Sequence, residues 1–197
     1  MELKLRSICL FCGSNAGSKP AYAEVARAFG HTLAERAITL VYGGGNVGLM
    51  GTAAEAALAA GGRVVGVIPD FLSERELGHP GLAELHVTHS MHERKALMAS
   101  LSDGFVALPG GFGTLDELFE IVTWAQLGLH QKPVGLLNAG GFYDPLLAMM
   151  DHLATEGFVR SEHLGLVVKD TAPGALLDQM QSQRAITASK WMDLERV

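Results

Sequence analysis

Short apolar runs alternate along the chain with longer stretches in which apolar positions recur at helical spacing. The runs predict strands at residues 7–12, 38–42, 63–68, 85–88, 104–108, 133–137 and 164–168. The stretches between them predict helices at 21–37, 49–60, 91–101, 115–129, 145–156 and 172–184. A polar, turn-rich loop is expected over 69–83.

The predicted strands are apolar throughout and do not alternate with polar residues. Such strands belong to a parallel sheet that is covered on both faces. Repeated strand–helix units with short connections therefore predict an α/β fold, a Rossmann-like open doubly wound parallel sheet of about seven strands with helices on both faces. No repeat or linker interrupts the pattern, so residues 1–197 are expected to form a single nucleotide-binding domain.

Composition and charge narrow the function. Apolar residues make up 48% of the chain and charged residues 18%, as in a globular protein, and the net charge of −6 argues against a nucleic-acid partner. No secretory signal or membrane-spanning run is seen, which predicts a cytoplasmic protein without a membrane partner. Cys9 and Cys12 share one apolar run and are expected as buried, reduced thiols rather than a zinc or redox site.

Ligands of open α/β sheets bind beyond the carboxyl ends of the strands, and a glycine loop follows the second strand there. Residues 43–48 read GGGNVG and match G-x-G-x-x-G. A dinucleotide site is disfavoured, because the match does not follow the first strand and no clear ribose-binding acid ends the next one. The alternative is a tight strand-to-helix turn.

A second glycine loop, residues 109–114 with the sequence PGGFGT, joins a strand to a helix. Its main-chain N–H groups and the helix N-terminus favour an anion, and Thr114 adds a hydroxyl donor. The loop lacks the Lys of a P-loop, so a phosphate monoester fits better than a nucleoside triphosphate. The alternative is again a plain turn, with Thr114 capping the helix.

Two candidate catalytic groups lie near this sheet edge. Thr114 to Glu117 forms a capping-box pattern, so Glu117 either holds a backbone N–H or faces the ligand crevice. Arg94 and Lys95 lie in the first turns of the preceding helix, where cations are unfavourable unless an anion or carboxylate compensates them. A solvated charge cluster is the alternative. The nearby histidines show no metal-binding pattern.

The combination of Met91-His92-x-Arg94-Lys95 with Pro109-Gly110-Gly111-x-Gly113-Thr114-x-x-Glu117 resembles the LOG family of cytokinin riboside 5′-monophosphate phosphoribohydrolases, also labelled "lysine decarboxylase-like". The resemblance extends to Cys12-Gly13-Ser14, Tyr42-Gly43-Gly44-Gly45 and Thr123-Trp124-Ala125-Gln126-Leu127-Gly128, and thus covers residues from about 7 to 168.

The resemblance implies hydrolysis of the N-glycosidic bond of an N6-modified AMP to the free base and ribose 5-phosphate. It places the family's catalytic arginine and glutamate on Arg94 and Glu117. The substrate-binding positions that it implies are Ser14, Gly44, Gly45, Glu76, Lys95, Gly110, Gly111, Phe112, Gly113, Thr114 and Thr123. It also implies no metal, no cofactor and a homodimer. Asp116 departs from the family, where many members carry Glu.

The chemistry of the residues agrees with this resemblance. Glycosidic cleavage passes through a cation-like sugar that a carboxylate such as Glu117 stabilises, or the carboxylate activates water. Arg94 is expected to offset charge on the leaving purine or to hold the phosphate; the sequence leaves both open. The alternatives are a general AMP nucleosidase, a non-catalytic carrier of a phosphorylated cofactor such as molybdenum cofactor, and, weakest, a pyridoxal-phosphate lysine decarboxylase.

Two predicted helices bear on assembly. The helices at 115–129 and 49–60 are apolar on more than one side, which indicates burial on both sides. One side is expected to meet the sheet and the other a second subunit, unless helices of the same chain cover it.

Overall fold

A single parallel sheet organises the computed structural model, which describes residues 4–73 and 81–183. The strands run in the order β4-β3-β2-β1-β5-β6-β7, and every neighbouring pair is parallel. They are β1 (Ser7–Phe11), β2 (Thr39–Tyr42), β3 (Val64–Pro69), β4 (Glu84–Thr88), β5 (Gly104–Ala107), β6 (Val134–Leu137) and β7 (Val167–Asp170). The predicted doubly wound α/β fold is thereby confirmed.

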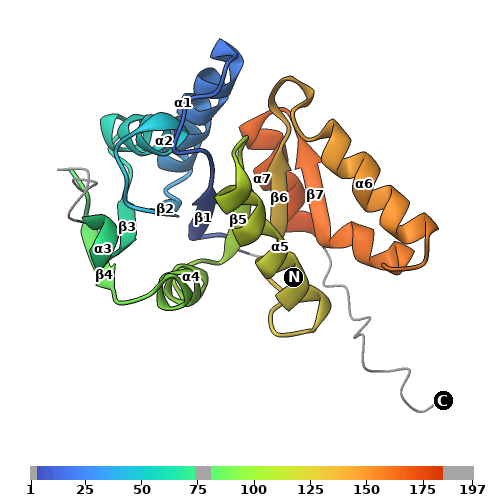
Figure 1. The fold of residues 1–197 in the computed structure, drawn as a ribbon. Helices are drawn as coiled ribbons and strands as arrows, with labels where there is room; N and C mark the ends of the chain where they lie inside the picture. Colours follow the sequence, from blue (N-terminus) through green and yellow to red (C-terminus); the bar gives the residue numbers. More distant parts are fainter. Residues whose placement is uncertain (1–3, 74–80, 184–197) are drawn as a thin grey trace.

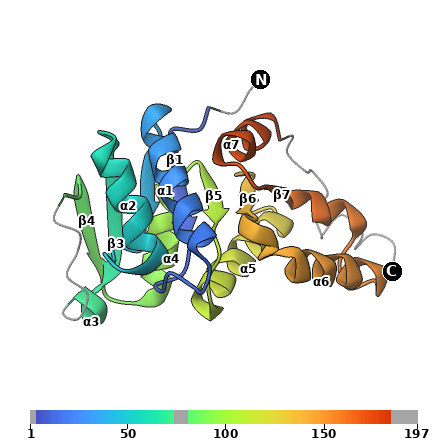
Figure 2. The same ribbon diagram turned by 90° about the horizontal axis from the view of Figure 1, so that it is seen from above.

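Helices cover both faces of the sheet (Figures 1 and 2). They are α1 (Pro20–Glu35), α2 (Gly48–Ala59), α3 (Asp70–Ser73), α4 (Met91–Ser100), α5 (Phe112–Gln126), α6 (Asp144–Thr155) and α7 (Pro173–Ser182), with short 3-10 turns η1 (Ala139–Gly141) and η2 (Ser161–Leu166). One core packs α1, α2 and α7 on the sheet, and a second core packs α4 and α5 on the other face. No helix within the described ranges has the length and apolarity to cross a bilayer.

The position of β1 creates the ligand crevice. β1 pairs with β2 on one side and with β5 on the other, so the chain winds outward in opposite directions from these two central strands. The loops after β1 and β5 therefore diverge at the carboxyl edge, where open sheets bind ligands. Two backbone hydrogen bonds hold the loops there. Gly13 N–H donates to the Pro109 carbonyl oxygen (3.0 Å), and Leu49 N–H donates to the Gly13 carbonyl oxygen (3.0 Å).

The start of α5 differs from the sequence prediction. The helix begins at Phe112 rather than residue 115, with Gly111 as an N-cap that has no side-chain acceptor. Thr114 is thus inside the first turn, and the capping-box alternative for Thr114 and Glu117 is not realised. A comparable cap forms on α4 instead, where Ser90 Oγ accepts from Glu93 N–H and Glu93 accepts from His89 N–H.

The strand predicted at 164–168 is also partly wrong. Residues Ser161–Leu166 form η2, and β7 begins only at Val167. The buried His163 ring lies within hydrogen-bonding distance of Gln126 (3.0 Å). This contact holds η2 against α5, where the backbone forms a 3-10 helix rather than a strand. The edge strand β4 is largely exposed and the edge strand β7 is largely half-buried, unlike the buried central strands.

The second apolar side of α2 packs on α1 of the same chain, so that helix needs no second subunit. A Cβ at Gly30 of α1 would collide with the Ala53 carbonyl oxygen of α2, which shows how close the two helix backbones are. Small residues make this approach possible: Gly30, Ala53, Ala54 and Ala57 are all buried.

We expect Gly30→Ala to lower the free energy of unfolding by about 2 kcal/mol, because the added methyl overpacks the α1–α2 contact. Gly113→Ala is the matched control: its Cβ meets no atom, and alanine should stabilise the helix by up to about 1 kcal/mol. Urea unfolding measures both changes. Equal or higher stability of Gly30→Ala would show that the helices have room to separate.

Candidate active site

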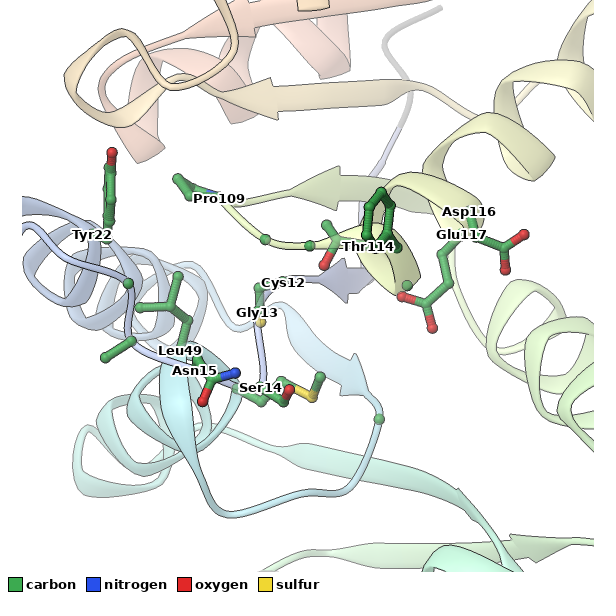
Figure 3. A pocket seen from close by; sticks show the side chains of 18 of the residues that line it. Cys12, Gly13, Ser14, Asn15, Tyr22, Leu49, Pro109, Thr114, Asp116 and Glu117 are labelled. Carbon is green, nitrogen blue, oxygen red and sulfur yellow. The ribbon is translucent and has the colours of Figure 1, made fainter.

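A cavity of about 540 Å³ opens at the crevice between the loops that follow β1 and β5 (Figure 3). Its walls come from the first loop, the start of α2, the glycine loop after β5 and the first turns of α4 and α5. Figure 3 shows Tyr22 at one end of the cavity and Glu117 with Asp116 at the other. The volume is sufficient for a nucleotide-sized ligand.

A buried ion pair closes the α4–α5 end of this cavity. Arg94 Nη1 of α4 donates to Glu117 Oε1 of α5 at 2.9 Å, with the side chains 8% and 10% exposed. Arg94 Nε also donates to the carbonyl oxygen of Val67 in β3 (3.0 Å). Three elements thus hold one guanidinium, and a buried pair with these extra bonds is oriented rather than free.

Gly43 makes room for that guanidinium. A Cβ at this position would collide with Arg94 Nη2 and approach Met50 Sδ at 3.3 Å. The first glycine of the GGGNVG motif therefore serves the placement of Arg94. Gly44, with a positive φ of 80°, continues the turn toward β3.

The glycine loop ends at the uncapped N-terminus of α5. Gly111 carries no side chain that could accept from the first-turn N–H groups, so these amides face the cavity without a side-chain cap. Thr114 is 4% exposed and packs directly over Gly110, where a Cβ would collide with its side chain. Free amides at a helix N-terminus are a ready site for a phosphate.

Burial sets the protonation of the groups that line the cavity. It raises the pKa of Glu117 above its ordinary value, while the Arg94 charge and hydrogen bond oppose that rise. Burial, with a further contribution from Glu117, raises the pKa of Cys12 far above its ordinary value and keeps the thiol neutral. Cys9 and Cys12 are both free and buried.

Most of the predicted site residues lie together. Those that line the cavity are Ser14, Arg94, Gly110, Gly111, Phe112, Gly113, Thr114 and Glu117. Gly44 and Gly45 are buried behind its wall and are not lining residues. Thr123 lies on the outer side of α5, in an open depression. Glu76 lies outside the described residues.

Lys95 also lies away from the cavity walls. Its ammonium contacts Asp116 Oδ2 (3.1 Å) and Glu120 Oε1 (3.0 Å) on α5, and its side chain is 11% exposed. Although burial lowers the pKa of Lys95, the bonds to Glu120 and Asp116 outweigh it and raise the pKa above its ordinary value. Its contact with substrate stays a prediction.

Sequence reasoning did not single out several residues that line the cavity, namely Asn15, Tyr22, Gly43, Met50, Leu72 and Phe142. Tyr22 and Phe142 meet edge to face, with ring centroids 5.7 Å apart. Gly43 was visible in its motif, but only its closeness to Arg94 shows its task. The aromatic pair comes from residues 120 positions apart, so no local pattern could have joined them.

Named enzymes from plants and a bacterium are similar in sequence to most of this chain. A cytokinin riboside 5′-monophosphate phosphoribohydrolase of Arabidopsis thaliana is 44% identical over 203 residues, which cover 100% of this chain and 94% of that protein. The enzyme of the same name from Rhodococcoides fascians is 54% identical over 155 residues, 78% of either chain. A probable enzyme of this name from rice is 49% identical over 174 residues, 88% of this chain and 78% of that one.

Solved structures share the fold at lower identity. The molybdenum cofactor binding protein of Rippkaea orientalis has a TM-score of 0.68 and 23% identity, covering 91% of this chain and 98% of its own. The molybdenum cofactor carrier protein of Chlamydomonas reinhardtii has a TM-score of 0.69 and 22% identity, covering 91% of this chain and 99% of its own. At this identity the likeness speaks for the fold alone.

A family model described as "possible lysine decarboxylase" matches residues 50–180. The matched segment includes the Arg94–Glu117 pair and the PGGFGT loop. Together with the identities above, this match shows that the chain belongs to the LOG family, whose model bears that description.

Proposed function

We propose that this protein hydrolyses cytokinin riboside 5′-monophosphates, which are N6-modified derivatives of AMP, to the free base and ribose 5-phosphate. The observation that carries the proposal is the buried Arg94–Glu117 pair beside a loop of uncapped amides, in one nucleotide-sized cavity. Relatives with 44–54% identity bear the name of this activity. The enzyme is a nucleoside 5′-monophosphate N-glycosidase.

In the proposed mechanism the 5′-phosphate binds the first-turn amides of α5, from Gly111 to Thr114, which suit an anion. This places the ribose toward Glu117, at the end of the cavity where the carboxylate lies. The bond between C1′ and the purine nitrogen breaks, and the carboxylate stabilises the cation-like sugar and orients water toward C1′. The water oxygen bonds to C1′, and its proton ends on the departing base.

Arg94 is assigned to the leaving group in this proposal. Its Nε and Nη1 are held by Val67 O and Glu117, while Nη2 lies beside Gly43 at the cavity wall. A fixed guanidinium there offsets the negative charge that develops on the purine. Because the α5 amides supply the donors for the phosphate, the proposal does not require Arg94 to bind the phosphate.

Apolar side chains that line the cavity favour an N6-modified base over plain AMP. Met50 Sδ lies near Gly43 beside the guanidinium, and Leu72 and Met91 line the same cavity. An apolar N6 substituent would gain from contact with them, at about 25 cal/mol per Å² of buried apolar area.

We also propose a homodimer formed through the outer side of α5, and a cytoplasmic location. Phe112 and Phe119 are 94% and 40% exposed, and with Leu115 and Trp124 they line an open depression of about 460 Å³. Exposed aromatic side chains in one patch favour a protein contact. The two free cysteines support a reducing compartment such as the cytoplasm.

The proposed reaction is tested by chromatography of products from N6-isopentenyl-AMP, AMP and N6-isopentenyladenosine. We expect free base from the modified monophosphate, slower release from AMP, and a kcat/KM roughly 10²-fold lower for the riboside, because it lacks the phosphate. Fastest cleavage of AMP would favour the general nucleosidase. Tight nucleotide binding without any turnover would favour a carrier.

Glu117→Gln and Arg94→Ala are each expected to lower kcat by about 10²-fold or more, because each removes a charge that acts on the transition state. Glu24→Gln, an exposed carboxylate on α1, is the matched control and should leave kcat unchanged. Circular dichroism confirms folding before each assay. A near-native rate in folded Glu117→Gln would leave that residue a purely structural partner of Arg94.

Light scattering at micromolar concentration tests the homodimer, and we expect the mass of two chains. Phe119→Arg should shift the protein toward the monomer, because it places a charge in the apolar patch. Phe158→Arg, at an 81% exposed phenylalanine that does not line this depression, should not. A monomer in the unmodified protein contradicts this assembly.

A further inference from the structure

We infer that Asn15, in the loop between β1 and α1, is a further ligand of the substrate's 5′-phosphate. The inference rests on the proposed function, because it concerns the phosphate of the proposed substrate. Asn15 directly follows the Cys12-Gly13-Ser14 segment in the sequence, and the mechanism above gives it no task. Its position, its free amide and the way the backbone holds it all point to the phosphate.

Asn15 lies across the cavity from the start of α5. Ser14 and Asn15 line the cavity together with Gly111 and Thr114. Figure 3 shows Ser14 and Asn15 on the side of the cavity that faces Thr114. A phosphate that binds the uncapped amides of α5 therefore presents its remaining oxygens toward the loop after β1.

A phosphate inside a cavity needs hydrogen-bond donors from more than one direction. A phosphate monoester carries about −1.5 to −2 charges at neutral pH and three acceptor oxygens. Taking it out of water is costly unless those oxygens are hydrogen-bonded. The free amides of α5 end at Thr114, because Leu115 N–H already donates to the Gly111 carbonyl oxygen (3.1 Å). These amides lie at one helix end, so the oxygens on the far side of the phosphate must find their donors elsewhere.

The amide of Asn15 is available for that task. Its NH2 group has two donors, and within residues 4–73 and 81–183 no hydrogen bond occupies the Asn15 side chain. Asn138, which follows β6, is different: its Nδ2 donates to Asp144 Oδ1 (2.7 Å), and its Oδ1 accepts from Tyr143 N–H (2.7 Å). Asn138 thus serves its own turn, whereas Asn15 offers its donors to the cavity.

The backbone around Asn15 is held tightly. A Cβ at Gly48 would collide with the carbonyl group of Ser14 and approach the amide nitrogen of Asn15, and Gly48 has a positive φ of 61°. The last glycine of GGGNVG therefore lets the loop after β1 rest directly on the start of α2. The N–H and the carbonyl oxygen of Gly13 in the same loop are both hydrogen-bonded as well. A loop held in this way needs little reordering when an anion binds, which favours binding.

The test compares the hydrolysis of N6-isopentenyl-AMP with that of N6-isopentenyladenosine, because the two differ only in the phosphate. Asn15→Asp keeps the shape of the side chain but replaces its donors with a negative charge. We expect its kcat/KM to fall about 10²-fold for the monophosphate, because like charges repel, and less than about twofold for the riboside. Asn15→Ala should lower the monophosphate value about 10-fold, the loss of one hydrogen bond to a charged group. Equal losses for both substrates, or no loss for the monophosphate, would overturn the inference.

Asn46→Asp is the matched control. It makes the same substitution at another exposed asparagine, in the GGGNVG loop, and Asn46 does not line the cavity. The same change of net charge should leave both kcat/KM values as they are in the unmodified protein. A loss for the monophosphate as large as that of Asn15→Asp would assign the effect to overall charge and would count against the inference.

Binding of ribose 5-phosphate, measured by isothermal titration calorimetry, tests the contact without turnover. We expect Asn15→Ala to raise its Kd about 10-fold and to leave the Kd of N6-isopentenyladenine, which has no phosphate, unchanged. An unchanged Kd for ribose 5-phosphate would show that Asn15 does not bind the phosphate. Absence of hydrolysis by the unmodified protein would instead contradict the proposed function. The two failures are distinguishable, because the calorimetry requires no reaction.

Discussion

The buried ion pair between Arg94 and Glu117 is the interaction on which the site depends. Removing two charges from water is costly, and the cost is offset only when geometry and further hydrogen bonds are good. Here the guanidinium also binds the Val67 carbonyl, and Gly43 leaves the space that it occupies. Burial raises the pKa of Glu117, and the charge and hydrogen bond of Arg94 oppose that rise and favour the ionised carboxylate.

The topology explains why these two residues meet although 23 positions separate them. β1 and β5 are neighbours at the centre of the sheet, and α5 follows β5 directly while α4 precedes it. The N-terminal turns of both helices therefore point to one edge. The same edge receives the loop after β1, in which Gly13 N–H donates to the Pro109 carbonyl oxygen, so the uncapped amides of α5 and the ion pair share one cavity.

The sequence predicted the seven strands, the six longer helices and the two residues Arg94 and Glu117, because those depend on local patterns and on motif spacing. It did not predict α3 (Asp70–Ser73), where a loop was expected, or the direct contact between Arg94 and Glu117. The sequence-based predictions were wrong where tertiary contacts determine the local structure. The capping-box alternative at Thr114 is not realised, because the helix begins at Phe112 with Gly111 as its N-cap, and Glu117 contacts Arg94. Residues 164–166, which were expected to form a strand, lie in the 3-10 helix η2, because His163 is buried against Gln126. Gly44 and Gly45 belong to the right loop, yet only Gly43 lines the cavity, a distinction that spacing cannot make.

The chain belongs to the LOG family, and the geometry of its cavity is compatible with the reaction for which its relatives are named. The most direct measurement is a crystal structure of the Glu117→Gln protein with uncleaved N6-isopentenyl-AMP. The account predicts the phosphate on the amides at Gly111 to Thr114, C1′ facing the residue at position 117, and the base beside Arg94. A nucleotide with its phosphate at Lys95, or with C1′ turned away from position 117, would contradict it.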